Sequence, residues 1–226
     1  MDRIDKDLRD RCGEVRDQGP RPTCLAFATS DTHAVVRSPW SALSCEFIFY
    51  HAQRRGGRLP TQGATLSFML EALKEDGQPI ESAWPYLTRL PADLAKWVPP
   101  STPLELYRRG NTVNTSAVDE VIRLLDMDTP SLMVMMLSDA FYKPNADGIV
   151  NAPPGEQPDP TRLHAVVAIG HGMHASDRHI LVRNSWGTGW GMKGYAWLPE
   201  RFLNYRLRKV VALTEEINVP SSALAA

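Results

Sequence analysis

Residues 180–195 read ILVRNSWGTGWGMKGY, which joins an apolar run of strand length to a glycine-rich segment. Asn184 ends the apolar run and is followed by Ser185, Trp186 and Gly187. The amide oxygen of an asparagine can accept a hydrogen bond from an imidazole N–H and so orient the ring without adding a full charge. Asn184 is therefore a candidate for orienting a histidine from elsewhere in the chain.

A histidine and a cysteine upstream of Asn184 have the chemistry of a nucleophilic pair. His164 opens the apolar run HAVVAIG, and Cys24 stands at the first turn of a helix expected over residues 24–37. Unpaired backbone N–H groups and the helix dipole favour a thiolate at that turn. A buried structural cysteine is the alternative interpretation of Cys24. With His164 as base, the pair predicts nucleophilic catalysis.

Gln18 lies shortly before Cys24, in the turn-rich segment DQGP. Its side-chain NH₂ group can donate to an oxyanion, together with the backbone N–H of Cys24. Gln18 is therefore a candidate for stabilising negative charge that develops next to the nucleophile.

The first half of the chain has helical periodicity and the second half has apolar runs of strand length. Helices are expected after the N-caps Thr23, Ser44 and Thr65, and after a Ser116–Asp119 capping box. The expected strands cover residues 131–137, 164–170, 179–185, 194–199 and 209–214. A helical half followed by an antiparallel sheet indicates an α+β fold with two lobes.

The composition excludes several classes of protein. The 226 residues include 25 basic and 26 acidic side chains, a net charge of −1 that does not favour binding to nucleic acid or an anionic membrane. Three cysteines cannot all pair with one another, which argues against a disulfide scaffold. The polar start lacks the apolar core of a signal peptide, so the expected location is cytoplasmic, with a signal-independent secretion route as the alternative.

Three segments resemble those of the papain-like cysteine peptidases. Residues 15–28, VRDQGPRPTCLAFA, resemble the active-site segment of the family. Residues 164–170 are similar to its histidine strand, and residues 180–195 resemble its asparagine motif. The resemblance implies a papain-like two-lobe fold, with a helical N-terminal lobe, an antiparallel β-barrel-like C-terminal lobe and an active site in the cleft between them. The whole chain, 1–226, is expected to be one such domain, with lobes at 13–115 and 116–218 and a flexible tail at 219–226.

The resemblance also assigns roles to individual residues. It implies Cys24 as nucleophile, His164 as general base and then acid, Asn184 as the group that orients His164, and Gln18 as a donor in the oxyanion hole. Trp186 is expected to shield the Asn184–His164 hydrogen bond from water. No cofactor and no metal are implied, and the histidines at 171, 174 and 179 are expected to be solvated rather than metal-binding.

The substrate cleft is expected to be apolar by the same resemblance. Besides Trp186, its expected lining residues are Ala64, Leu66, Phe68, Met135, Leu163 and Ala165. Such a lining predicts preference for an apolar side chain two residues before the cut bond. For Leu66, Phe68 and Met135, packing in the core is the stronger interpretation, because helix faces and strands need core residues in any case.

The sequence departs from the family pattern beside the nucleophile. Arg21 occupies the position of a cysteine that is usually paired in a disulfide, and Leu25 replaces a tryptophan. The absence of that disulfide is typical of bacterial members and fits a reducing compartment. No inhibitory prosegment is expected before Cys24. Either the chain is an excised mature enzyme, or its activity is expected to be restrained by narrow substrate choice or by an external partner, a proteinaceous inhibitor or an immunity partner.

The function predicted from these residues is hydrolysis of peptide bonds by a cysteine peptidase through a Cys-His-Asn acyl-enzyme mechanism, with a peptide or protein as substrate. Two alternatives stay open from the sequence. One is a thioester-based acyl transferase or amide-forming enzyme, which uses the same groups. The other is a catalytically silent papain-like binding module, an alternative that the altered residues around Cys24 leave open.

Overall fold

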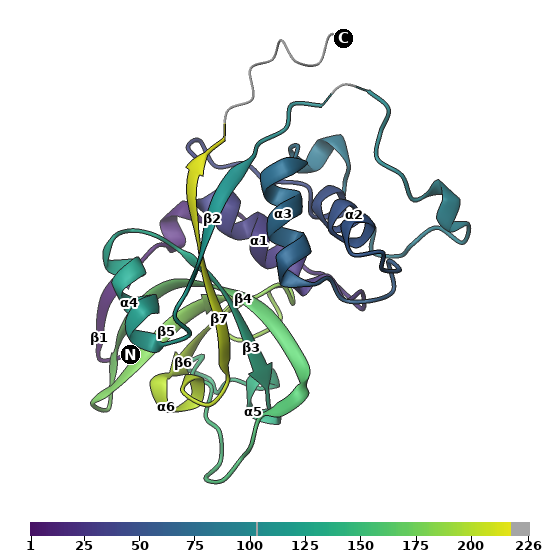
Figure 1. Ribbon diagram of the computed structural model, residues 1–226. Helices are drawn as coiled ribbons and strands as arrows, with labels where there is room; N and C mark the ends of the chain where they lie inside the picture. The colour runs from purple at the N-terminus through teal and green to yellow at the C-terminus, as the bar shows by residue number, and fades with distance from the viewer. Residues whose placement is uncertain (103, 218–226) are drawn as a thin grey trace.

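The computed structural model describes residues 1–102 and 104–217 of the chain. Figure 1 shows a group of helices on one side of the molecule and a large sheet on the other. The helical part contains α1 (Cys24–Val35), α2 (Cys45–Arg55) and α3 (Leu66–Glu75). The α+β class with two lobes is therefore confirmed. The expected tail at 219–226 lies outside the described residues.

The sheet is antiparallel throughout its seven strands. Its order is β2 (Arg109–Asn114), β7 (Leu207–Glu216), β3 (Ser131–Leu137), β4 (Asp159–His174), β5 (Asp177–Arg183) and β6 (Tyr195–Pro199), with β1 (Arg3–Asp7) also paired to β4. Short helices α4 (Val118–Asp126), α5 (Asp139–Tyr142) and α6 (Glu200–Leu203) connect the strands, and single 3₁₀ turns occur at Arg9–Arg11, Glu81–Ala83 and Leu94–Lys96. The strands β1 and β2 are not among those expected from the sequence.

Helix α1 is the central helix of the fold. All its residues from Leu25 to Val35 are buried, which explains why its sequence has only an imperfect apolar stripe. It packs against α2 on one side and against β4 on the other. In contrast, α3 buries one face only, with Met69, Leu70 and Leu73 turned inward, as its periodicity predicts. The burial of α1 fixes its first residue, Cys24, next to the sheet.

The expected helix caps are partly wrong. Ser44 accepts a hydrogen bond from the backbone N–H of Phe47 at 3.1 Å, as predicted. Thr23 and Thr65 precede their helices, but neither side chain caps them. The hydroxyl of Thr23 instead lies 2.8 Å from that of Tyr86. The Ser116 hydroxyl donates to the carbonyl of Arg208, so that Ala117 is the N-cap residue of α4.

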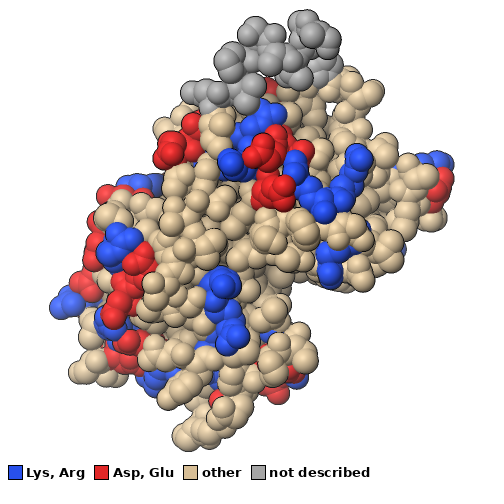
Figure 2. Space-filling view, viewed as in Figure 1, with Lys and Arg blue, Asp and Glu red and all other residues tan. Residues whose placement is uncertain are grey.

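Charges are mixed over the surface. Figure 2 shows basic and acidic side chains interspersed on one face of the molecule. This distribution agrees with the balanced composition and forms no extended field of one sign on that face. Among the described residues, no helix combines the length and the apolar character that a membrane span requires.

Candidate active site

Cys24 is the first residue of α1 and is partly buried. The chain reaches it through a turn in which the Asp17 carboxylate accepts a hydrogen bond from the backbone N–H of Gly19, which has a φ of 56°. Burial raises the pKa of the Cys24 thiol, and the backbone N–H groups of Ala165 and Leu25 act in the opposite direction. Ala165 directly follows His164 on β4, the strand against which α1 packs.

His164 lies on β4, opposite Met135 of β3, and is buried. Its Nε2 atom is 2.7 Å from Oδ1 of Asn184, and the same oxygen accepts a hydrogen bond from the backbone N–H of Ser185 at 2.8 Å. Because Oδ1 can only accept, Nε2 must carry the proton of the neutral ring. The unprotonated nitrogen is then Nδ1. Burial lowers the pKa of His164 to about 4.

Aromatic side chains cover the His164–Asn184 hydrogen bond. The Trp186 ring lies 4.7 Å from the His164 ring, and Phe141 packs edge-on against His164 at 5.7 Å. Tyr142 stacks on Trp186, with centroids 5.1 Å apart and 17° between the planes. Trp190 donates its indole N–H to the carbonyl of Phe141 at 3.0 Å. No motif in the sequence points to Phe141 and Tyr142, which belong to the short helix α5.

Gln18 is held between two lobes of the molecule. Its backbone N–H donates to the carbonyl of Ser185 at 2.8 Å, and its Oε1 accepts from the Ser185 hydroxyl at 2.7 Å. Its Nε2 donates to the backbone carbonyl of Arg21 at 2.8 Å. Ser185 is a site residue that the sequence patterns do not single out, although it directly follows Asn184. It contacts both Gln18 and Asn184.

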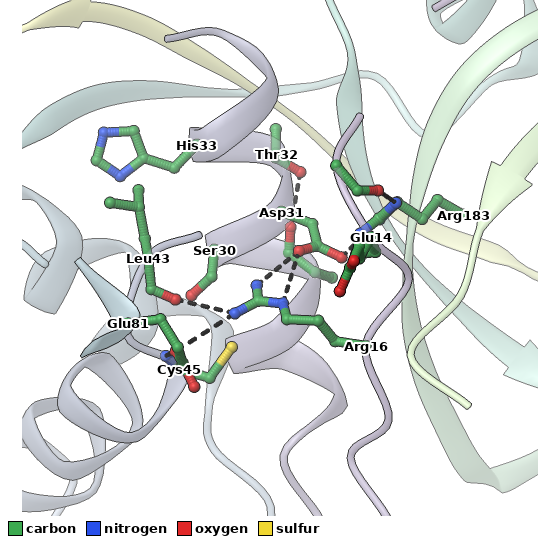
Figure 3. A network of polar contacts seen from close by, with 12 residues as sticks. Glu14, Arg16, Ser30, Asp31, Thr32, His33, Leu43, Cys45, Glu81 and Arg183 are labelled. Carbon is green, nitrogen blue, oxygen red and sulfur yellow. Dashed lines mark hydrogen bonds and ion pairs between the residues drawn. The ribbon is translucent and has the colours of Figure 1, made fainter. Parts of the chain in front are cut away.

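Figure 3 shows a cluster of charged side chains around Asp31 of α1. Asp31 of α1 accepts from Arg16 at 2.6 Å and from Arg183 at 2.8 Å. Arg16 also donates to the carbonyl of Leu43, and the Glu81 carboxylate lies 3.4 Å from the Arg16 guanidinium. Burial alone raises the pKa of Asp31, but the two arginines more than offset this and the pKa lies below its usual value. The cluster fastens the segments that carry Gln18, Cys24 and Asn184 to one another.

The residues expected to line the substrate cleft differ in exposure. Leu163 is the most exposed of them, at 58%, and lies directly beside His164. Ala64, Leu66, Phe68 and Trp186 are partly buried. Ala165 is buried, and Met135 is fully buried at 0%. Gly63, next to Ala64, lies against the Pro22 carbonyl, which brings that segment close to the loop before Cys24.

The three cysteines are free thiols, and burial raises the pKa of Cys12 to about 11 and that of Cys45 to about 12. The expectation that the histidines at 171, 174 and 179 are solvated is wrong for His171 and His179, which are buried. His171 and His174 pair with Asp126 and Asp2 respectively. In the described part of the chain, no three histidine, cysteine or acidic side chains are grouped so that they could hold a metal ion.

The chain is similar in sequence to known cysteine proteases. The sequence model described as "Papain family cysteine protease" matches residues 3–211. A cathepsin L-like proteinase of Fasciola hepatica is 28% identical over 198 residues, covering 80% of this chain and 55% of the relative. Caricain of Carica papaya is 29% identical over 190 residues, covering 78% and 49%. The chain thus spans about half the length of these curated relatives.

Solved structures show the same fold. Xylellain, a cysteine protease from Xylella fastidiosa, superposes with a TM-score of 0.74 at 22% identity, covering 92% of this chain and 85% of that one. A Carica candamarcensis cysteine protease in complex with E-64 gives 0.71 at 23% identity, covering 92% and 97%. The family match over residues 3–211, together with these folds, shows that the chain belongs to the papain family of cysteine proteases.

Proposed function

We propose that this protein is a cysteine peptidase that hydrolyses peptide bonds through an acyl-enzyme on Cys24. The observation that carries the proposal is the His164 Nε2–Asn184 Oδ1 hydrogen bond, which leaves Nδ1 as the basic nitrogen on β4, the strand against which the helix of Cys24 packs. An imidazole held in one tautomer next to a thiol is the arrangement that general-base activation of a nucleophile needs.

Burial affects how the thiolate forms. It raises the pKa of Cys24 and lowers that of His164 to about 4, so neither a lone thiolate nor a lone imidazolium is favoured. Transfer of the thiol proton to Nδ1 creates both charges together as an ion pair, which keeps the net charge of the site unchanged. The reactive form of Cys24 therefore depends on His164.

The reaction then follows from the positions of the groups. The sulfur attacks the peptide carbonyl, and the resulting oxyanion accepts hydrogen bonds from the Cys24 backbone N–H and from Gln18. His164 passes its proton to the leaving amine as the C–N bond breaks. Water, deprotonated by His164, attacks the thioester and releases the acid and the thiol. Trp186 keeps bulk water away from the His164–Asn184 bond during these steps.

The side chain that is recognised two residues before the cut bond is proposed to be apolar. Leu163 is exposed beside His164, while Ala64 and Leu66 are partly buried, and none of the three carries a charge. Met135 is fully buried on β3, and we assign it to packing rather than to substrate contact. Apolar surface of this kind favours apolar peptide side chains by the area that it removes from water.

Cleavage of a peptide library, followed by mass spectrometry, tests the proposal. Cys24→Ala and His164→Ala are expected to abolish cleavage, whereas Cys12→Ala, a matched control at another partly buried thiol, retains it. Products that are free acids indicate hydrolysis, and amides formed with an added amine would indicate acyl transfer instead. Cleavage by the Cys24→Ala variant would rule out the proposed mechanism.

A further inference from the structure

Arg21 and Glu46 form a buried ion pair beside the candidate active site. Arg21 is 6% exposed and Glu46 of α2 is 0% exposed. The contact is bidentate, with Nη1–Oε2 at 2.6 Å and Nη2–Oε1 at 2.9 Å. The carboxylate also accepts from the Trp97 indole N–H at 2.6 Å and from the Leu87 backbone N–H at 2.9 Å. Glu46 is thus held by three separate groups and holds the guanidinium in one place.

Aromatic rings fix the same guanidinium from its sides. Its central carbon lies 5.0 Å from the Tyr86 ring and 5.6 Å from the Phe49 ring. The Tyr86 hydroxyl in turn donates to the backbone carbonyl of Gln18 at 2.8 Å. The side chain of Arg21 is therefore fixed in the helical lobe. Tyr86, which contacts the guanidinium, also binds the backbone of Gln18.

The backbone of Arg21 contacts the side chain of Gln18 directly. The Arg21 carbonyl accepts the hydrogen bond from Gln18 Nε2, while the Ser185 hydroxyl donates to Oε1 at the other end of the amide. A carboxamide is planar, so bonds at one N–H and at the oxygen fix the direction of the second N–H. Among the described residues, Nε2 has only the Arg21 carbonyl as acceptor, and its second N–H remains available.

We propose that the Arg21–Glu46 ion pair is a positioning element that aims the Gln18 amide at the oxyanion. The proposal rests on the proposed peptidase function, in which Gln18 donates to that oxyanion. The three cysteines of the chain are free, so an ion pair and its hydrogen bonds, rather than a disulfide, hold the loop before Cys24.

A role in stability alone does not account for this pair. Taking two charges out of water carries a desolvation cost that offsets much of their attraction, and well-packed apolar residues often stabilise a fold equally well. What the bidentate geometry adds is direction, because a planar guanidinium with two parallel hydrogen bonds fixes the orientation of the residue that carries it.

The test compares peptide cleavage with alkylation of Cys24 in the variants Arg21→Met and Glu46→Gln. Cleavage develops an oxyanion, whereas alkylation of Cys24 by iodoacetamide requires the thiolate but no oxyanion. We expect kcat to fall roughly 10- to 100-fold, with KM changed by less than about 2-fold and the alkylation rate of Cys24 unchanged, because an oxyanion donor acts in the transition state. Arg55→Met, which breaks the Arg55–Asp76 pair at the other end of α2, is the control and should leave kcat unchanged.

A double-mutant cycle with Gln18→Ala shows whether Arg21 affects cleavage through Gln18. If Arg21 acts through Gln18, Arg21→Met costs little further activity in the Gln18→Ala background. Additive losses, or a parallel loss of alkylation, would overturn the inference. Should Arg21→Met not fold, Arg21→Met combined with Glu46→Leu removes both charges and is measured in the same cycle. Absence of cleavage by the native protein would instead count against the proposed function.

Discussion

The Nε atom of Arg183 donates a hydrogen bond to Oδ2 of Asp31 at 2.8 Å, although the two residues are separated by 152 positions in the sequence. Arg183 directly precedes Asn184, and Asp31 lies two turns along α1 from Cys24. One buried contact therefore links the end of β5, directly before Asn184, to the helix that begins at Cys24. Arg16 donates to the other oxygen of Asp31 and so links the segment that contains Gln18 to the same helix.

Replacement of Asp31 by asparagine is expected to destabilise the fold. The substitution keeps the size of the side chain but leaves Arg183 without its buried counter-charge and Arg16 with only the more distant Glu81, which costs about 3 kcal/mol of unfolding free energy. Urea unfolding monitored by tryptophan fluorescence gives this value. Asp128→Asn, which affects the half-exposed Lys6–Asp128 pair, serves as control and should cost less than about 1 kcal/mol. Equal losses in the two variants would contradict the role given to Asp31.

His33 predicts a specific dependence of stability on pH. Burial lowers its pKa to about 3, while an unfolded histidine titrates near about 6.5. The unfolded state therefore binds one more proton between these values, and His33 contributes stability above pH ~6.5 that is lost as the pH falls toward its folded pKa. His33→Gln removes this contribution. Between pH 6 and 5, the advantage of the native protein over the variant should shrink by about 1 kcal/mol. Parallel pH profiles for the two proteins would exclude this assignment.

Alkylation of the native protein at neutral pH is expected to occur at Cys24. Burial raises the pKa of Cys12 to about 11 and of Cys45 to about 12, so their thiolates are scarce, whereas Cys24 can lose its proton to His164. Peptide mapping after brief treatment with iodoacetamide identifies the modified residue. His164→Ala should slow the modification of Cys24 at least about 10-fold, because the proton acceptor is gone. Modification of Cys12 at the same rate as Cys24 would be inconsistent with this selectivity.

Removal of the Trp186 ring should weaken catalysis without unfolding the protein. Trp186→Ala opens the His164–Asn184 hydrogen bond to water, and competition from water loosens the ring orientation. We expect kcat to fall about 10-fold with a smaller change in KM. Trp186→Phe retains a ring over His164 and should recover part of the activity. The control is Tyr205→Ala, a 75% exposed aromatic residue on the surface. Full activity of Trp186→Ala would contradict the shielding role.

Local sequence patterns predict this fold well where the structure depends on near neighbours. Ser44 caps α2 as expected, and the apolar face of α3 is buried. The same patterns are wrong where a polar side chain has a distant partner in the fold. The Thr23 hydroxyl forms a hydrogen bond with Tyr86, and the Ser116 hydroxyl donates to the Arg208 carbonyl, so neither side chain caps the helix that it precedes. Cap propensity is a local preference, and a tertiary hydrogen bond of similar strength replaces it.

The segments around Cys24, His164 and Asn184 by themselves indicate the family and the candidate site, because the chemistry of nucleophilic catalysis restricts which residue types can serve. Which atoms meet depends on contacts between segments that are distant in the chain. The tertiary structure left Nδ1 of His164 as the unprotonated ring nitrogen, because Asn184 Oδ1 accepts from Nε2 and from the Ser185 N–H, and it paired Arg21 with Glu46 and brought Tyr142 over Trp186. These contacts join residues far apart in the chain, and burial of charged and aromatic groups fixes their geometry, which periodicity and spacing along the sequence do not encode.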